Sequence, residues 1–97
     1  MSFDPAIRQI IASFRKSPNW DATLDLQMLQ ALWPAVIGES LARETSIAAL
    51  DGSRVIIRVP DSAWTDQLLS VRETLLEKMN APWPHRWIRD IGFTYEN

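Results

Sequence analysis

The sequence of 97 residues contains no cysteine, so disulfide bonds and thiolate metal sites are excluded. It has only three glycines, and their spacing forms no phosphate-binding loop. Its single histidine, His85, has no convergent partners for catalysis or metal binding. Glu73 and Glu77 share one helix face, which is more typical of a solvated surface than of a general-acid pair. The sequence therefore favours a binding domain over an enzyme, and it indicates no cofactor and no metal.

Long apolar runs are also missing. The longest, 31–38, is far shorter than the roughly 20 residues that span a bilayer. The first five residues have neither the basic segment nor the apolar run of a secretory signal, so we expect a soluble, cytoplasmic protein. The net charge of −2 does not suit a protein that mainly coats nucleic acid, because Lys and Arg supply most of that affinity.

The first segment predicts an amphipathic helix over 5–16, because its apolar residues recur at helical spacing. These residues are Ile7, Ile10, Ile11 and Phe14. Two interpretations stay open: the helix packs on the rest of the chain, or it detaches and docks on a partner. We expect one N-terminal helix over 1–18 and one domain over 21–97.

A second helix is expected to begin at Asp21 or Thr23, either of which can cap it, and to run to about residue 43. Pro34 lies inside this pattern. Proline lacks a backbone donor and disfavours helix at the residue before it, so a kink or a break is predicted at Trp33.

Residues 45–59 predict a β-hairpin around Asp51-Gly52, with Leu50 opposite Ser53. In this register one face of the hairpin is apolar and forms the core side. That face carries Ala48, Leu50, Val55, Ile57 and Val59. The opposite face carries Arg54 and Arg58 around the apolar residues Ile47 and Ile56, and it is expected to meet water or a partner.

A single helix is predicted over 62–80, with a continuous apolar stripe at steps of four and three. A loop over 81–86 follows, and Trp83 within it is the best candidate for an exposed aromatic residue. A last strand is predicted over 87–95, with a bulge near Arg89 or Asp90. The stripe of the helix consists of Trp64, Leu68, Val71, Leu75 and Met79.

These elements predict a two-layer α/β fold, in which a three-stranded sheet has its helices on one face in the order α-α-β-β-α-β. If Trp64 is buried, its replacement by alanine should cost about 3–5 kcal/mol. The expected core consists of Trp33, Val36, Val55, Ile57, Trp64, Leu68, Leu75, Ile91 and Phe93.

Several motifs, taken in order, resemble one bacterial family. They are Leu32-Trp33-Pro34-Ala35-Val36-Ile37-Gly38-Glu39, Leu41-Ala42, Leu50-Asp51-Gly52, 55–59, Asp61-Ser62-Ala63-Trp64 with Leu68, 75–80 and Ile88-Arg89-Asp90-Ile91-Gly92-Phe93. From Leu24 to Phe93 the chain is similar to the DciA family. The resemblance implies a domain similar to K-homology folds and a role in loading the hexameric replicative helicase DnaB onto single-stranded DNA. It implies no ATPase motif, and no catalytic residue is carried over.

The leading hypothesis is therefore a non-enzymatic, DciA-like adaptor in DNA replication that contacts the replicative helicase, with single-stranded DNA as a further candidate partner. The alternatives are a small RNA-binding K-homology-like protein and a self-associating structural domain that exchanges its first helix between copies. The candidate contacts are cations of the first helix and of the open sheet face, namely Arg8, Arg15, Lys16, Arg54 and Arg58.

Overall fold

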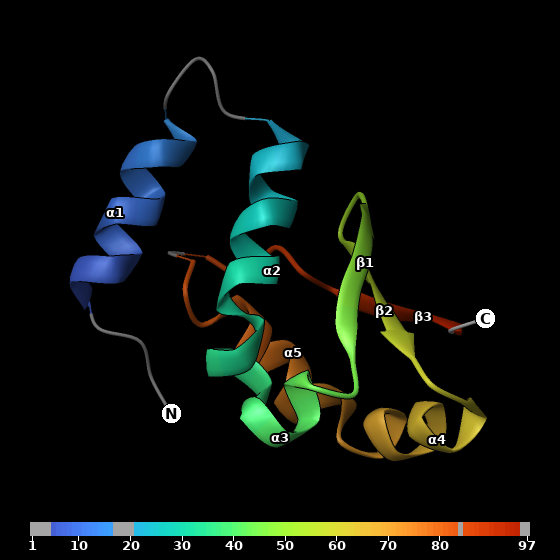
Figure 1. The fold of residues 1–97 in the computed structure, drawn as a ribbon. Helices are drawn as coiled ribbons and strands as arrows, with labels where there is room; N and C mark the ends of the chain where they lie inside the picture. The colour runs from blue at the N-terminus through green and yellow to red at the C-terminus, as the bar shows by residue number, and fades with distance from the viewer. Residues whose placement is uncertain (1–4, 17–20, 84, 96–97) are drawn as a thin grey trace.

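The computed structural model describes residues 5–16, 21–83 and 85–95 (Figure 1). The expected α/β class and three-stranded sheet are confirmed, with one helix more than predicted in the second half of the chain. The elements are α1 (Pro5–Arg15), α2 (Ala22–Ile37), α3 (Glu39–Ala42), β1 (Ser46–Asp51), β2 (Arg54–Val59), α4 (Ser62–Ser70), α5 (Arg72–Asn80) and β3 (Asp90–Tyr95).

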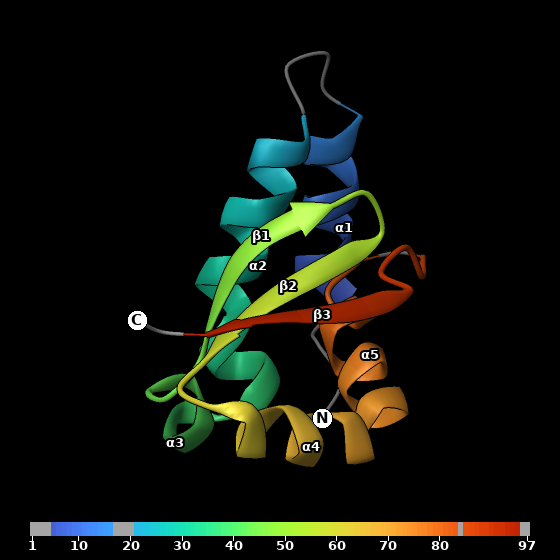
Figure 2. The ribbon, with the colours of Figure 1, turned by 90° about the vertical axis from the view of Figure 1, so that its right-hand side faces the viewer.

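The sheet has β2 at its centre, between β1 and β3. β1 and β2 form the antiparallel hairpin, whereas β3 runs parallel to β2 after the crossover through α4 and α5. The helices lie on one face of the sheet, and Figure 2 looks onto the other face, which no described helix covers. In Figure 1, α2 lies between the sheet and α1, so α1 forms an outermost layer.

The second predicted helix begins where the sequence indicates but breaks later. Asp21 caps α2, since its carboxylate accepts a hydrogen bond from the N–H of Leu24 at 3.1 Å. The expected break at Trp33 is wrong, because α2 continues through the exposed Pro34 to Ile37. The helix ends at Gly38, whose φ of +96° lies in a region that favours glycine and whose N–H donates to the Pro34 carbonyl.

The hairpin register differs from the predicted one because the turn lies one residue later in the chain. Asp51 pairs with Arg54, so the two turn residues are Gly52 and Ser53 rather than Asp51 and Gly52. Gly52 has a φ of +61° at the first turn position, where a two-residue hairpin with glycine first requires it.

A bulge between Ile47 and Ala49 then shifts the pairing of β1. Because the extra residue reverses the alternation of side chains, Ile47 pairs with Ile57 and is buried in the core. The prediction that Ile47 lies on the open face is therefore wrong, whereas Ile56 does lie opposite the buried side chains of β2.

The helix predicted over 62–80 is in fact two helices that meet at Val71. Val71 has φ −117° and ψ 26°, outside the helical region. The Ser70 hydroxyl donates to the Gln67 carbonyl at 2.6 Å, a local bond that competes with regular helix geometry. The break turns α5 away from the axis of α4 (Figure 1), which a continuous apolar stripe in the sequence does not reveal.

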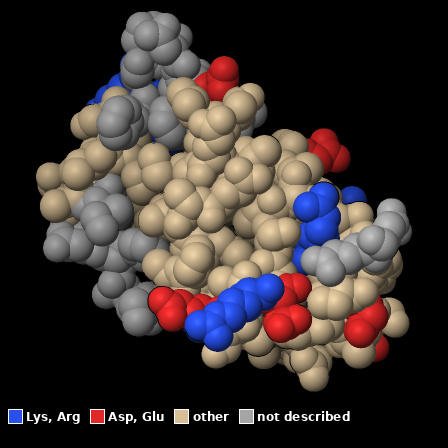
Figure 3. Space-filling view, in the orientation of Figure 1, with Lys and Arg blue, Asp and Glu red and all other residues tan. Residues whose placement is uncertain are grey.

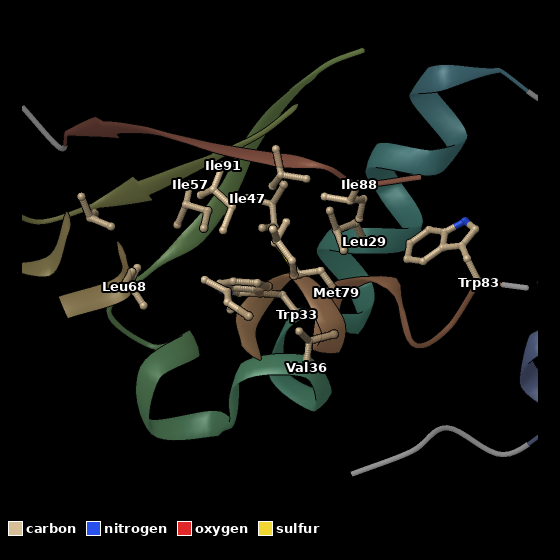
Figure 4. Packing of buried hydrophobic residues seen from close by; sticks show 14 of the residues in the cluster. Leu29, Trp33, Val36, Ile47, Ile57, Leu68, Met79, Trp83, Ile88 and Ile91 are labelled. Atoms are coloured by element: carbon tan, nitrogen blue, oxygen red, sulfur yellow. The ribbon is translucent and has the colours of Figure 1, made fainter. Parts of the chain in front are cut away.

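The core lies between the sheet and the helices (Figure 4). Trp33 is 3% exposed, and its indole N–H donates to the Thr45 hydroxyl at 3.1 Å. Trp64 and Phe93 are only partly buried and pack against the edge of the core. The other residues expected in the core are buried: Val36, Val55, Ile57, Leu68, Leu75 and Ile91.

The segment after α5 is organised by the buried side chain of Asn80. Its amide group donates to the carbonyls of Leu76 and Ile88, and its oxygen accepts the N–H groups of Trp87 and Ile88, all at 2.8–3.0 Å. These bonds hold Trp87 and Ile88 against the end of α5.

This arrangement overturns two expectations about the segment. Trp83 is 1% exposed, so the prediction that it is an exposed aromatic residue is wrong. Its ring meets the ring of Trp87 edge-on, with centroids 5.3 Å apart. β3 begins only at Asp90 and pairs regularly with β2, so the expected bulge near Arg89 is also wrong.

Helix α1 occupies the predicted position and lies against the outer side of α2 (Figure 1). Ile11 is 2% exposed and belongs to the core cluster, whereas Ile10 is 54% exposed. The side chains of Ile7, Arg8 and Phe14 lie outside what the structure describes. Among the described residues, no helix is long and apolar enough to cross a membrane.

Candidate partner-binding face

The uncovered side of the sheet, here called the open face, is built by the alternation of side chains along β2. Val55, Ile57 and Val59 point into the core, so the residues between them point away from it. Pairing with the neighbouring strands places further residues on the same side. The open face thus consists of Ser46, Ala49, Asp51, Arg54, Ile56, Arg58, Asp90, Gly92 and Thr94.

The centre of the open face is apolar. Ile56 pairs with Ala49 on one side and with Gly92 on the other. A side chain at Gly92 would meet Ile56 Cδ1 at 2.8 Å and Arg54 Nε at 3.2 Å. The side chains of Ile56 and Arg54 therefore lie over Gly92, and the absence of a side chain there lets them do so.

One end of the open face is a chain of ion pairs. Arg54 Nε lies 3.3 Å from Asp90, and the second oxygen of Asp90 lies 3.3 Å from Arg72. Arg72 also contacts Glu73 at 2.9 Å, and Glu73 lies 3.6 Å from Arg86. Arg72 further donates to the Arg89 carbonyl at 3.1 Å, so the network joins β2, β3 and the start of α5.

Asp90 at the centre of this network is held in its ionised form. The N–H of Ile91 donates to its carboxylate, and this bond lowers its pKa most, followed by the hydrogen bond from Arg72 and the nearby charge of Arg54. Its pKa therefore lies below the ordinary value of 3.8, and the folded chain binds this proton less tightly than the unfolded chain.

The lowered pKa of Asp90 predicts a specific acid sensitivity. The stabilisation by its ionised form is fully present above about pH 4 and is lost as the pH falls through the lowered pKa. Urea unfolding of the wild type and of Asp90→Asn between pH 6 and pH 2.5 measures how much unfolding free energy each protein loses on acidification. We expect the wild type to lose more stability on acidification than the variant; equal losses would show that Asp90 is not stabilised as described.

Arg58, at the other end of the open face, is a free cation. It is exposed, it pairs along the backbone with Ser46 and Thr94, and it has no acidic partner among the described residues. On the face that Figure 3 shows, the described residues form no continuous basic patch. The charge of Arg58 is therefore available to a partner.

The candidate cations of α1 lie elsewhere. Figures 1 and 2 place α1 beyond α2, on the side of the molecule opposite the open face. Arg15 is engaged within the molecule, since it lies 3.4 Å from Asp25 and 3.1 Å from His85. Lys16 is exposed. Of the four candidate contacts whose side chains the structure describes, Arg54 and Arg58 share the open face, whereas Arg15 and Lys16 lie on the other side of the molecule.

Comparison with models of protein families shows to which family this chain belongs. The model of the family described as "Dna[CI] antecedent, DciA" matches residues 6–93, which includes β1, β2, most of β3 and nearly all of the helices. The chain belongs to the DciA family. No curated protein matches the chain.

Membership assigns a role as a loader or operator of the DnaB helicase in replication, which is not an enzymatic role. The geometry agrees with a protein that works by contact. Among the described residues, no three His, Cys, Asp or Glu side chains are placed to hold a metal ion. The match begins inside α1, so this DciA-family domain includes the helix that lies against α2.

Proposed function

We propose that this chain acts as an adaptor that contacts the DnaB-type helicase through its open face. The observation that carries the proposal is a sheet face with an apolar centre at Ile56 and a free cation at Arg58. The described helices lie on the other side of the sheet, where α2, α4 and α5 contact its strands (Figure 2). A helicase loader without enzymatic activity works by contact with its partner, and the open face is the side of the sheet that no described helix covers.

The two arginines of the open face have different parts in this proposal. Arg58 would pair with a carboxylate of the partner without breaking any bond within the chain, because it has no acidic partner among the described residues. Arg54 is already compensated by Asp90, so it contributes mainly its aliphatic stem, which lies over Gly92 beside Ile56. We therefore expect Arg58 to contribute more to helicase affinity than Arg54.

The second part of the proposal concerns direct binding of single-stranded DNA by this chain. Phosphate neutralisation by Arg and Lys supplies most of the affinity of such contacts. With one free cation on the open face and a net charge of −2, we propose that this chain by itself binds single-stranded DNA weakly and only at low salt. DNA would then be held mainly by the helicase in a joint complex.

The experiment compares Arg58→Glu with Arg43→Glu, an equal change of charge at an exposed arginine just after α3. Binding of each full chain to the replicative helicase of its own organism is measured by calorimetry at two salt concentrations. We expect Arg58→Glu to weaken binding about tenfold, with the difference shrinking at high salt, and Arg43→Glu to bind like the wild type.

Two results would contradict the proposal. If both variants bind like the wild type, the open face is not the contact. If neither the wild type nor either variant binds the helicase, the proposed adaptor function is wrong for this chain. RNA binding then becomes the hypothesis to test next.

A further inference from the structure

β3 is an edge strand, because no described strand lies beyond it in the sheet (Figure 2). The N–H of Asp90 donates to the Ser53 carbonyl at 3.3 Å, so the backbone groups of Asp90 point toward β2. In a strand, the N–H and C=O of one residue point to the same edge, and successive residues alternate between the two edges. Every second residue of β3 therefore directs its backbone groups to the outer edge. These residues are Ile91, Phe93 and Tyr95.

The first half of this outer edge is closed by side chains of the chain itself. The N–H of Ile91 donates to the Asp90 carboxylate at 2.9 Å. Arg72 donates to the carbonyl of the residue that precedes β3, at 3.1 Å. No described residue bonds to the outward backbone groups of Phe93 and Tyr95. In the second half of β3, main-chain donors and acceptors are therefore available to a partner.

Nothing in the second half of β3 blocks pairing with another strand. Edge strands of natural proteins are protected by charged side chains, proline or bulges. Residues 91–95 are uncharged, contain no proline and pair with β2 without a register shift. Tyr95 is 48% exposed and Phe93 is only partly buried, so aromatic surface lies along the same edge. The edge is thus suited to an extended segment that adds to the sheet by main-chain hydrogen bonds.

Arg58 indicates which side chain such a segment carries. Thr94 of β3 pairs with Arg58 of β2, so both lie on the open face. A strand added beyond β3 lies about 4.8 Å from it and places one side chain on the open face directly beside Thr94. Arg58 flanks Thr94 on the other side and has no acidic partner among the described residues. Because the Thr94 side chain is short, a carboxylate of the added strand can meet Arg58 above it.

The β3 strand of a second copy does not offer this carboxylate. The only acidic residue of β3 is Asp90, and its two oxygens are engaged by Arg54 and Arg72, each at 3.3 Å. Pairing of two β3 strands would leave Arg58 without an acidic partner or would compete with the ion pairs of Asp90. The edge therefore fits an extended segment of a different protein.

We propose that the helicase contributes an extended segment that pairs with the outer edge of β3 as a fourth strand, with an acidic side chain beside Thr94 and Arg58. This inference rests on the proposed function, because it states how the helicase reaches the open face. Hydrogen bonds to the backbone of Phe93 and Tyr95 supply affinity, and the acidic residue supplies selectivity. On the opposite side of the added strand, apolar side chains cover the exposed surface of Tyr95.

The first test compares Tyr95→Pro with Tyr95→Val in the full chain. Both substitutions remove the aromatic ring, but only proline also lacks the outward N–H. Neither removes a hydrogen bond to β2, and circular dichroism verifies that each variant is folded. Binding to the replicative helicase is measured by calorimetry. We expect Tyr95→Pro to bind about tenfold more weakly than Tyr95→Val, and equal binding would overturn the inference.

The second test measures hydrogen exchange of single amides in the wild-type chain, alone and with the helicase. Exchange is quenched in dimethyl sulfoxide and read by NMR. We expect the Phe93 amide to exchange roughly tenfold more slowly when the helicase is bound. The Thr94 amide, which points toward β2, is the internal control and should be protected in both states.

The possible outcomes separate this inference from the function on which it rests. Helicase binding with an unchanged Phe93 amide would overturn the fourth strand and leave the adaptor function standing. Absence of helicase binding would overturn both. Protection of Phe93 that rises with the concentration of the chain alone would identify a second copy as the occupant and would also overturn the inference.

Discussion

Replacing Trp33 with alanine is expected to lower the free energy of unfolding by about 4 kcal/mol. Trp33 is 3% exposed at the centre of the core (Figure 4), and removal of a buried tryptophan leaves a cavity that the packed surroundings fill only in part. The Thr45 hydroxyl also loses the indole N–H that it accepts. This is a large fraction of the stability of a domain of this size.

The control for this prediction is Trp64→Ala. Trp64 packs against the core but is only partly buried, so its loss should cost about 2 kcal/mol rather than the 3–5 kcal/mol expected for a buried tryptophan. Urea unfolding followed by circular dichroism measures both. Equal losses for the two variants would contradict the placement of Trp33 at the centre and Trp64 at the edge.

Asn80→Ala is expected to destabilise the chain by about 3 kcal/mol, a lowering of the melting temperature of roughly 15 °C. The substitution leaves the N–H and the carbonyl of Ile88 without their partner, and Ile88 is fully buried. The N–H of Trp87 loses its acceptor as well. A buried polar group without a partner costs about 1–3 kcal/mol, so the four lost bonds together outweigh the better helix propensity of alanine.

Lys78→Ala is the matched control, because Lys78 is an exposed residue of the same helix turn. It should melt within a few degrees of the wild type. If Asn80→Ala melts like Lys78→Ala, the side chain of Asn80 does not organise residues 81–88, and the burial of Trp83 has another cause.

Local signals in the sequence were sufficient to predict most elements. Asp21 caps α2 and Asp61 caps α4, since each carboxylate accepts a backbone N–H two or three residues ahead. Alternation along β2 correctly separated the buried Val55 and Ile57 from the outward Arg54 and Arg58. These features depend on neighbours within a few residues, which a sequence displays directly.

The wrong predictions concern features whose structure depends on contacts between residues far apart in the sequence. The bulge in β1 turns Ile47 into the core, and it depends on the pairing with β2 rather than on any residue type in β1. α2 continues through Pro34, and Trp33 beside it is anchored to Thr45, twelve positions away. Trp83 is buried because Asn80 folds the following segment back through bonds to Trp87 and Ile88. No periodicity in the sequence indicates such contacts.

The same distinction holds for the candidate contacts. The positions of Arg54 and Arg58 on one face follow from strand alternation. The engagement of Arg15 with Asp25, His85 and Trp87 joins segments up to 72 positions apart, so α1 could not be assigned as docked or detached from its own sequence.

The most direct test of the open face as the helicase contact is methyl NMR of the full chain with labelled isoleucines. The chain has nine isoleucines. Ile56 marks the open face, Ile57 the core, and the exposed Ile10 marks α1. On titration with the replicative helicase, we predict that the Ile56 signal broadens or shifts first, while Ile57 and Ile10 change little. An unchanged Ile56 signal with a strongly perturbed Ile10 would contradict the account and place the contact on α1.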